Sequence, residues 1–299
     1  MIEKIATFLK NIFDWSKSER CFIRYFIEAF KYTNNNVLLL SLLICSVFVV
    51  SIYMLVSTVR GVNPLLTMLI VILLMAAIAS GLFYTIKQEI KTDINENSHD
   101  IKSVFPMFYT GIGKNYLLFL GIFLLFFIFA TGIIMGTFLL ANTLICDVSE
   151  LGIDSAAFFQ IIATDNNAIN TFLASLSADQ QAYFRAWNRL FFFNTHIFTL
   201  LLMLWIPEQI YTRRNIFITL FSSIKKVFKD FLNVLCLFLT MSLLNVVLTA
   251  FVLFPVHNQF LLFVFSILSM IVPMYLLLFD FYALFLYYQA KYIEPYDRG

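Results

Sequence analysis

Two carboxylate residues, Glu208 and Asp280, interrupt otherwise apolar stretches of the sequence. A charged side chain at the centre of a membrane costs about 2.5–3.5 kcal/mol on insertion scales, so such residues often serve ion or proton pathways. Glu208 lies roughly one helical turn before Arg213 and Arg214. Two interpretations stay open. Either Glu208 marks a helix end, where a salt bridge or water neutralises it, or Glu208 and Asp280 line a cavity that opens to the cytoplasm.

Two further residues complete this candidate intramembrane polar site. Pro273 precedes Asp280 by about two turns, and a proline inside a helix removes a backbone hydrogen bond and can kink the helix. Asn245 lies in the preceding apolar stretch, where an amide can hydrogen-bond a neighbouring helix at a gain of about 0.6–1 kcal/mol. Helix packing is therefore the simpler interpretation of Asn245, and a role in the site is the alternative.

Two pairs of small residues are spaced four apart, which places both members of each pair on one helix face. They are Gly132 with Gly136 and Ala77 with Gly81. Small side chains let helices approach closely inside a membrane. The pairs therefore predict close helix contacts, either within the chain or between the protomers of a homo-oligomer.

The sequence lacks the common catalytic motifs. It contains no HExxH, GxSxG or GxxxxGK[ST] pattern, its three histidines are isolated from one another, and its four cysteines are far apart. We find no nucleophile or metal-ligand set within the apolar stretches. We therefore expect a protein that is not an enzyme, with no metal, no cofactor and no disulfide framework.

The composition indicates a polytopic helical membrane protein. Of the 299 residues, 61% are hydrophobic and only 13% are charged, whereas soluble domains have about 45–50% and 25%. The apolar residues form runs of about 20 or more, enough for a helix to cross the hydrocarbon layer. We predict an all-α fold with six transmembrane helices, at about 37–59, 64–86, 116–145, 190–211, 231–254 and 260–287.

The basic residues set the predicted orientation. If the six helices alternate across the membrane, all but three of the 20 basic residues fall on one side; the exceptions are Arg60, Arg185 and Arg189. Positive residues concentrate on the cytoplasmic side of membrane proteins. We therefore expect a multi-pass protein of the bacterial inner (cytoplasmic) membrane, with both termini in the cytoplasm.

Three segments share one design: an aromatic amphipathic stretch, a short elbow and then an apolar helix. They are 26–44, 104–125 and 216–239. Asn36, Asn115 and Asp230 precede the three apolar helices, where we expect each to cap a helix N-terminus. The pattern predicts an internal repeat of three helical hairpins, each preceded by an interfacial amphipathic helix.

This repeat divides the chain into two parts. Residues 1–36 are expected to form cytoplasmic interfacial amphipathic helices, and 37–299 the six-helix membrane domain. An outer segment at 146–189 interrupts that domain. Its helical spacing predicts one or two short helices against the outer ends of the bundle, with Ser177 as the cap of the second.

The end of the fourth apolar run and the segment after it carry a resemblance to a known family. LLMLWIP is followed, after a short gap, by ITLFSSIKKVFKDF. This arrangement resembles the bacterial six-helix membrane domain that is fused to some glycerophosphodiester phosphodiesterases, and its stand-alone relatives. The resemblance implies hairpins with amphipathic lead-ins. It does not imply the phosphodiesterase activity, because no soluble domain follows. The chain departs from that pattern at Glu208, where relatives have glycine, and in its long outer segment.

Two functions fit these features. The first is a scaffold, assembly factor or accessory subunit of an inner-membrane process. Its partners would be the lipid bilayer, anionic lipid headgroups at the cytoplasmic face, and a protein partner or a second copy of the chain. We expect no nucleic-acid partner. The second is a transporter or permease for a lipid-like or small amphipathic solute, with Glu208 and Asp280 in its pathway.

Overall fold

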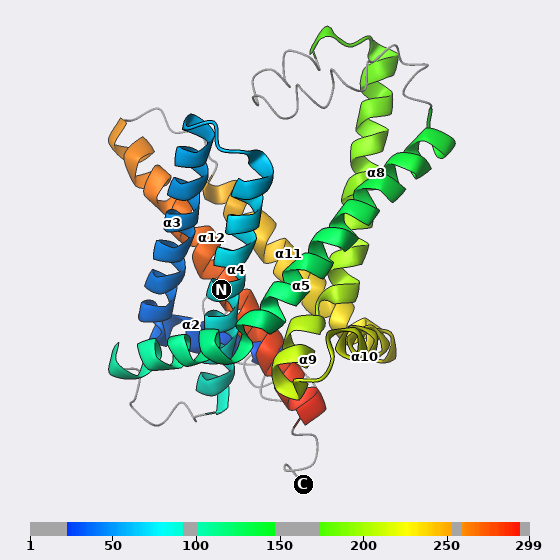
Figure 1. Ribbon diagram of the computed structural model, residues 1–299. Helices are drawn as coiled ribbons and strands as arrows, with labels where there is room; N and C mark the ends of the chain where they lie inside the picture. The colour runs from blue at the N-terminus through cyan, green and yellow to red at the C-terminus, as the bar shows by residue number, and fades with distance from the viewer. Residues whose placement is uncertain (1–22, 92–100, 147–173, 253–258, 294–299) are drawn as a thin grey trace, which may run out of the picture. The chain divides into compact units, whose positions relative to one another are not determined.

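The computed structural model describes residues 23–91, 101–146, 174–252 and 259–293, and every element within these ranges is a helix (Figure 1). The helices are α2 (Ile23–Asn35), α3 (Val37–Val59), α4 (Pro64–Lys91), α5 (Ile101–Leu144), α8 (Ala178–Leu202), α9 (Trp205–Thr212), α10 (Ile216–Lys229), α11 (Phe231–Val252) and α12 (Gln259–Tyr288), which a short π-helix, η2 (Gln289–Ile293), continues. Within these described ranges, six helical stretches are long and apolar enough to cross a membrane. The predicted polytopic α-helical fold is confirmed.

The chain forms two compact units. One contains residues 1–123 and 200–299, and the other contains residues 124–199. In the smaller unit, α5 and α8 form an antiparallel pair. Phe126 and Phe198 lie with ring centroids 5.9 Å apart, and Asn194 donates a hydrogen bond to Thr137 at 3.0 Å. Together with α3–α4 and α11–α12, which also pack side by side, this pair gives three antiparallel helix pairs.

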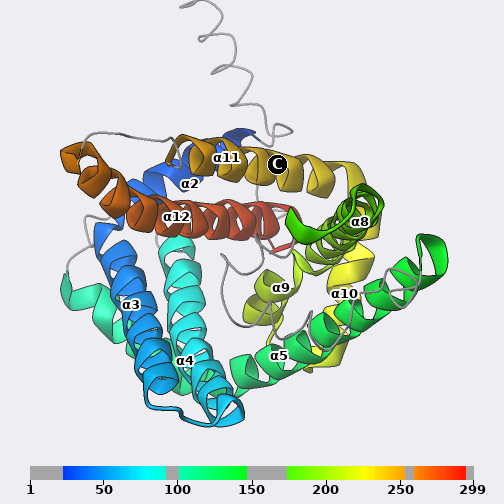
Figure 2. The same ribbon diagram turned by 90° about the horizontal axis from the view of Figure 1, so that it is seen from above.

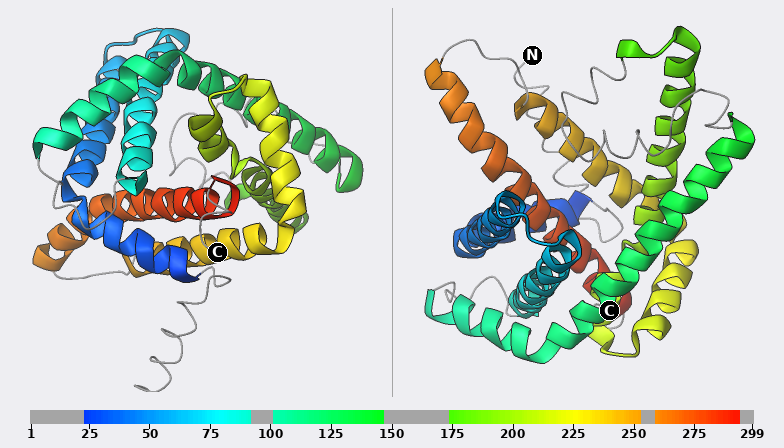
Figure 3. Two further views of the ribbon diagram at one scale, coloured as in Figure 1. Left: turned by 90° about the horizontal axis from the view of Figure 1, so that it is seen from below. Right: turned by 45° about the horizontal axis from the view of Figure 1, so that its top comes forward.

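Helix α12 is the central element of the larger unit. It contacts α2, α3, α4, α9 and α11, and Figures 2 and 3 show it running between α2 and α11 on one side and α3 and α4 on the other. Its last three turns are almost wholly buried, including Tyr282, Phe285 and Tyr288 at 0% exposure. Aromatic pairs join it to α2, because Phe26 stacks on Phe279 and Tyr32 stacks on Tyr282.

Two glycines allow the first part of α5 to cross α4 closely. An added Cβ atom at Gly111 would lie 2.8 Å from the Ser80 carbonyl oxygen, and one at Gly81 would lie 2.8 Å from the Phe108 ring. Figure 1 shows this part of α5 running across the lower end of α4. Gly81 of the predicted pair therefore lies in a close helix contact, and Ala77 lies one turn before it.

The other small-residue pair has no such role in the part of the chain that the structure describes. An added Cβ atom at Gly132 or Gly136 would meet no atom within 4 Å. A contact between protomers at this pair stays a prediction.

The fourth span differs from its prediction. It begins at Ala178 instead of residue 190, and it is interrupted at Met203–Leu204 before α9 begins. The predicted cap at Ser177 is confirmed, since Ser177 and Gln180 exchange backbone-to-side-chain hydrogen bonds of 2.9 and 3.3 Å. The helix that Ser177 caps continues into the fourth span, so the prediction of a separate second outer helix was wrong. The stretch 156–163 of the outer segment lies outside the described residues.

The predicted elbows were partly wrong. Asn36 separates α2 from α3, but its side chain makes no capping hydrogen bond. Asn115 lies inside α5, which continues through the expected elbow as one helix. In the third of the predicted repeat segments the side-chain cap is Asn215, which accepts a 3.0 Å hydrogen bond from the Phe217 N–H at the start of α10. Asp230 separates α10 from α11 and accepts instead from Tyr292.

Candidate functional site

The interruption of the fourth span produces α9, a helix of eight residues of which none is exposed. Pro207 lies in its first turn, where the missing N–H leaves no helical hydrogen bond unmade. Trp205, Glu208, Gln209 and Ile210 are all at most 3% exposed. The polar members of this set must therefore find partners within the protein.

Glu208 has three polar partners from two other helices. The Ser222 hydroxyl donates to Glu208 Oε1 at 2.8 Å, and Lys226 forms an ion pair with Glu208 Oε2. The Tyr288 hydroxyl also donates to Oε2, and Lys226 Nζ lies 2.7 Å from that hydroxyl oxygen. Ser222 and Lys226 are one turn apart on α10, so both side chains reach α9 from one face. We call Glu208, Ser222, Lys226 and Tyr288 the Glu208 cluster.

Aromatic rings complete the surroundings of the Lys226 ammonium. Its Nζ lies 4.7 Å from the ring centroid of Tyr288 and 4.8 Å from that of Tyr292, within the range of cation–π attraction. The Tyr292 hydroxyl donates to Asp230 Oδ2 at 2.7 Å, at the end of α10. Lys226 and Asp230, one turn apart at the end of α10, thus both contact residues at the end of α12 and in η2.

Glu208 therefore has a salt bridge, as the first sequence interpretation expected, but the partner is Lys226. Arg213 and Arg214 are exposed in the turn after α9. Arg213 has a left-handed backbone conformation, with φ at 51°, and its N–H closes α9 on the Gln209 carbonyl. The turn thus leads the chain away from Glu208, and α10 brings Lys226 back to it.

Asp280 has a different environment from Glu208. It is 9% exposed, and its Oδ2 accepts a 2.6 Å hydrogen bond from Asn245 Nδ2 on α11. Within the described part of the chain, its Oδ1 has no hydrogen-bond partner. Asp280 precedes Tyr288 by about 12 Å along α12, and the structure shows no hydrogen bond that joins the two carboxylates. Pro273 lies two turns earlier in the same helix.

A third buried carboxylate, Glu89 on α4, was missed at the sequence level. It is 4% exposed and accepts hydrogen bonds from Asn36 Nδ2 at 2.8 Å and from the Tyr282 hydroxyl. The predicted span ended at residue 86, whereas α4 continues to Lys91. Ile86 and Ile90 extend its apolar spacing past that point, and this was the available signal.

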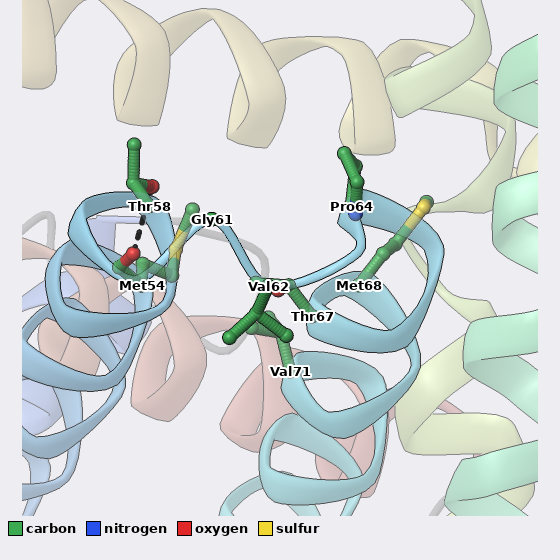
Figure 4. A pocket seen from close by; sticks show the side chains of 8 residues that line it. All are labelled: Met54, Thr58, Gly61, Val62, Pro64, Thr67, Met68 and Val71. Carbon is green, nitrogen blue, oxygen red and sulfur yellow. Dashed lines mark hydrogen bonds between the residues drawn. The ribbon is translucent and has the colours of Figure 1, made fainter.

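Two pockets in the described part of the chain contain none of these carboxylates or their hydrogen-bond partners in their linings. A groove of about 540 Å³ lies at the turn between α3 and α4, lined by Met54, Thr58, Gly61, Val62, Pro64, Thr67, Met68 and Val71, and Figure 4 shows the Thr58 hydroxyl bonded within its own helix. A smaller one of about 270 Å³ is lined by Tyr84, Gln88, Pro106, Met107 and Thr110. Neither lining contains a titratable carboxylate or a histidine. Among the described residues, no group of three or more His, Cys, Asp or Glu could hold a metal ion.

No family model, curated protein or solved structure matches this sequence.

Proposed function

We propose that this integral membrane protein is not an enzyme and acts as a scaffold, an assembly factor or an accessory subunit of an inner-membrane process. One observation carries the proposal: the Glu208 cluster fastens an amphipathic helix, α10, to the last membrane helix. A buried ion pair adds little net stability, but a protein loses much stability when one partner is removed. Such a pair suits a helix that must keep a defined position.

The opposite face of α10 is suited to a membrane surface. Phe217, Phe221 and Phe228 are 54%, 69% and 65% exposed, and Lys225 and Lys229 are exposed between and beside them. Aromatic rings favour the boundary between headgroups and acyl chains, and lysines favour anionic headgroups. The proposal thus includes the predicted orientation, with α10 and both termini on the cytoplasmic side. Membership of the six-helix family described above is part of the same proposal.

A partner protein is the test of this role. The full chain would be purified in native-lipid nanodiscs and the co-purifying proteins identified and quantified by mass spectrometry. We expect a stoichiometric protein with the wild type that is lost from the variant Phe221→Ala with Phe228→Ala on α10. The matched control is Leu243→Ala with Val246→Ala on α11, whose side chains are both 65% exposed. Absence of a stoichiometric protein would refute the scaffold, and equal retention by both variants would exclude the exposed face of α10 as the surface that binds the partner.

Transport of a lipid-like or small amphipathic solute is the second candidate. It is favoured by the interruption at Met203–Leu204 inside the fourth span and by the buried Asp280, because broken helices and intramembrane carboxylates mark many transport sites. If the wild type retains a solute or lipid and no protein partner, the protein would be reconstituted in vesicles and the flux of that molecule measured. Unchanged flux in Asp280→Asn would exclude Asp280 from the pathway.

A further inference from the structure

Lys87 on α4 is a buried cation with an unusual set of partners. The residue is 8% exposed, and its Nζ donates a 2.7 Å hydrogen bond to the backbone carbonyl of Ile210. The same Nζ lies 5.0 Å from the ring centroid of Tyr211. An ammonium group has three N–H donors, and one carbonyl and one ring face do not supply a full negative charge.

No carboxylate lies within ion-pair distance of Lys87 in the described part of the chain, where the salt bridges are Arg24–Glu28, Lys226–Glu208 and Lys291–Asp230. A buried charge ordinarily has a counter-charge, because the loss of its hydration is costly. Glu208, two residues before Ile210 on α9, meets this expectation through Lys226. Lys87 does not.

Two more cations add to the charge of Lys87 instead of offsetting it. Lys91 follows one turn later on α4, and the charges of Lys91 and Arg213 both act on the Lys87 ammonium. Lys91 and Arg213 are exposed, so this positive region is open to solvent or lipid. The carbonyl end of α9 supplies only about half a negative charge, so it leaves most of the positive charge unbalanced. We call Lys87, Lys91 and Arg213 the Lys87 cluster.

We propose that the Lys87 cluster binds a phosphate-bearing anion, either the headgroup of an anionic phospholipid or free phosphate. Guanidinium and ammonium groups hold phosphate oxygens through charge-assisted hydrogen bonds. A phosphate group presents several charged oxygens at once, which suits three cations at the end of α4 and in the turn after α9. The site does not depend on the scaffold proposal, since it requires no protein partner.

The first measurement uses the full chain in a neutral detergent. Inorganic phosphate and short-chain phosphatidylglycerol would each be titrated against thermal unfolding, with chloride at matched ionic strength as the reference. We expect wild-type stabilisation by at least one of the two ligands. Stabilisation by phosphatidylglycerol alone would identify a lipid headgroup site, and stabilisation by both would identify a site for phosphate itself. No stabilisation beyond that of chloride would overturn the proposal.

Variants locate the site. Lys87→Gln is expected to weaken the apparent ligand affinity about fivefold, the effect of one cation on anionic lipid. Arg213→Gly removes a charge at a position whose φ of 51° favours glycine, so it should stay folded even if Lys87→Gln does not. It should weaken the affinity by a similar factor. Arg60→Gln, in the exposed turn after α3, removes the same charge elsewhere. Equal weakening in Arg60→Gln and Arg213→Gly would refute the site.

Discussion

Two buried charges at α9 differ in their partners: within the described residues, Glu208 has a counter-charge and Lys87 has none. On one side Glu208 has a lysine, a hydroxyl and a phenol from α10 and α12. On the other side Lys87 of α4 has only a carbonyl and an aromatic ring of α9, and its charged neighbours are further cations. The first arrangement is complete within the chain. The second is completed only by an anion from outside, and this difference separates a structural cluster from a binding site.

Lys226→Met should have the largest effect, because it leaves the Glu208 carboxylate buried without its counter-charge. Removing one partner of a buried ion pair costs about 3–5 kcal/mol. We expect the free energy of unfolding to fall by the lower end of this range. The Lys226 side chain is 24% exposed, so water can reach the Glu208 carboxylate in its absence. Denaturant titration in detergent would measure it.

The double variant Glu208→Gln with Lys226→Met tests the cause of that loss. Replacing both charges is often close to neutral, so the double variant should recover most of the stability that Lys226→Met loses. If Lys226→Met alone unfolds like the wild type, the ion pair does not fasten α10, and the contrast between the two sides of α9 disappears.

Tyr288→Phe should have an intermediate effect. It removes the hydroxyl that donates to Glu208 but keeps the ring that stacks on Tyr211. Hydrogen bonds to charged groups contribute about 1.5–3 kcal/mol, and we expect a loss of about 2 kcal/mol in the same titration. Tyr292→Phe is the matched control: its hydroxyl bonds Asp230, which is 15% exposed, so its loss should be smaller. The reverse order would show that Glu208 does not need the Tyr288 donor.

Lys87→Met should have the smallest effect when phosphate and anionic lipid are both absent. The lost hydrogen bond to the Ile210 carbonyl is offset by relief of repulsion from Lys91 and Arg213. We expect a change of at most about 1 kcal/mol, of either sign. A loss as large as that of Lys226→Met, measured in the same detergent, would mean that the carbonyl and ring already satisfy Lys87 and that no anion is needed.

The membrane helices could be predicted because run length and charge are local properties. Residues 37–59 were predicted to the residue, and α11 and α12 to within about two residues at each end. The clusters could not be predicted, because their members come together only in the fold. Lys226 lies 18 positions after Glu208, and Tyr282 lies 193 positions after Glu89. The arginines nearest to Glu208 in sequence face elsewhere, since the left-handed residue Arg213 turns the chain at that point.

The central position of α12 has a consequence for biosynthesis. The Asn36 side chain reaches its Tyr282 partner across 246 positions, and Phe26 of α2 stacks on Phe279. A ribosome delivers these partners last, so the earlier helices must enter the membrane before their main contact exists. Until α12 arrives, Asn36 and Glu89 lack the Tyr282 hydroxyl that bonds both of them. We therefore expect the unfinished chain to expose polar groups to insertion chaperones and quality-control proteases, and a chain that lacks α12 to be degraded.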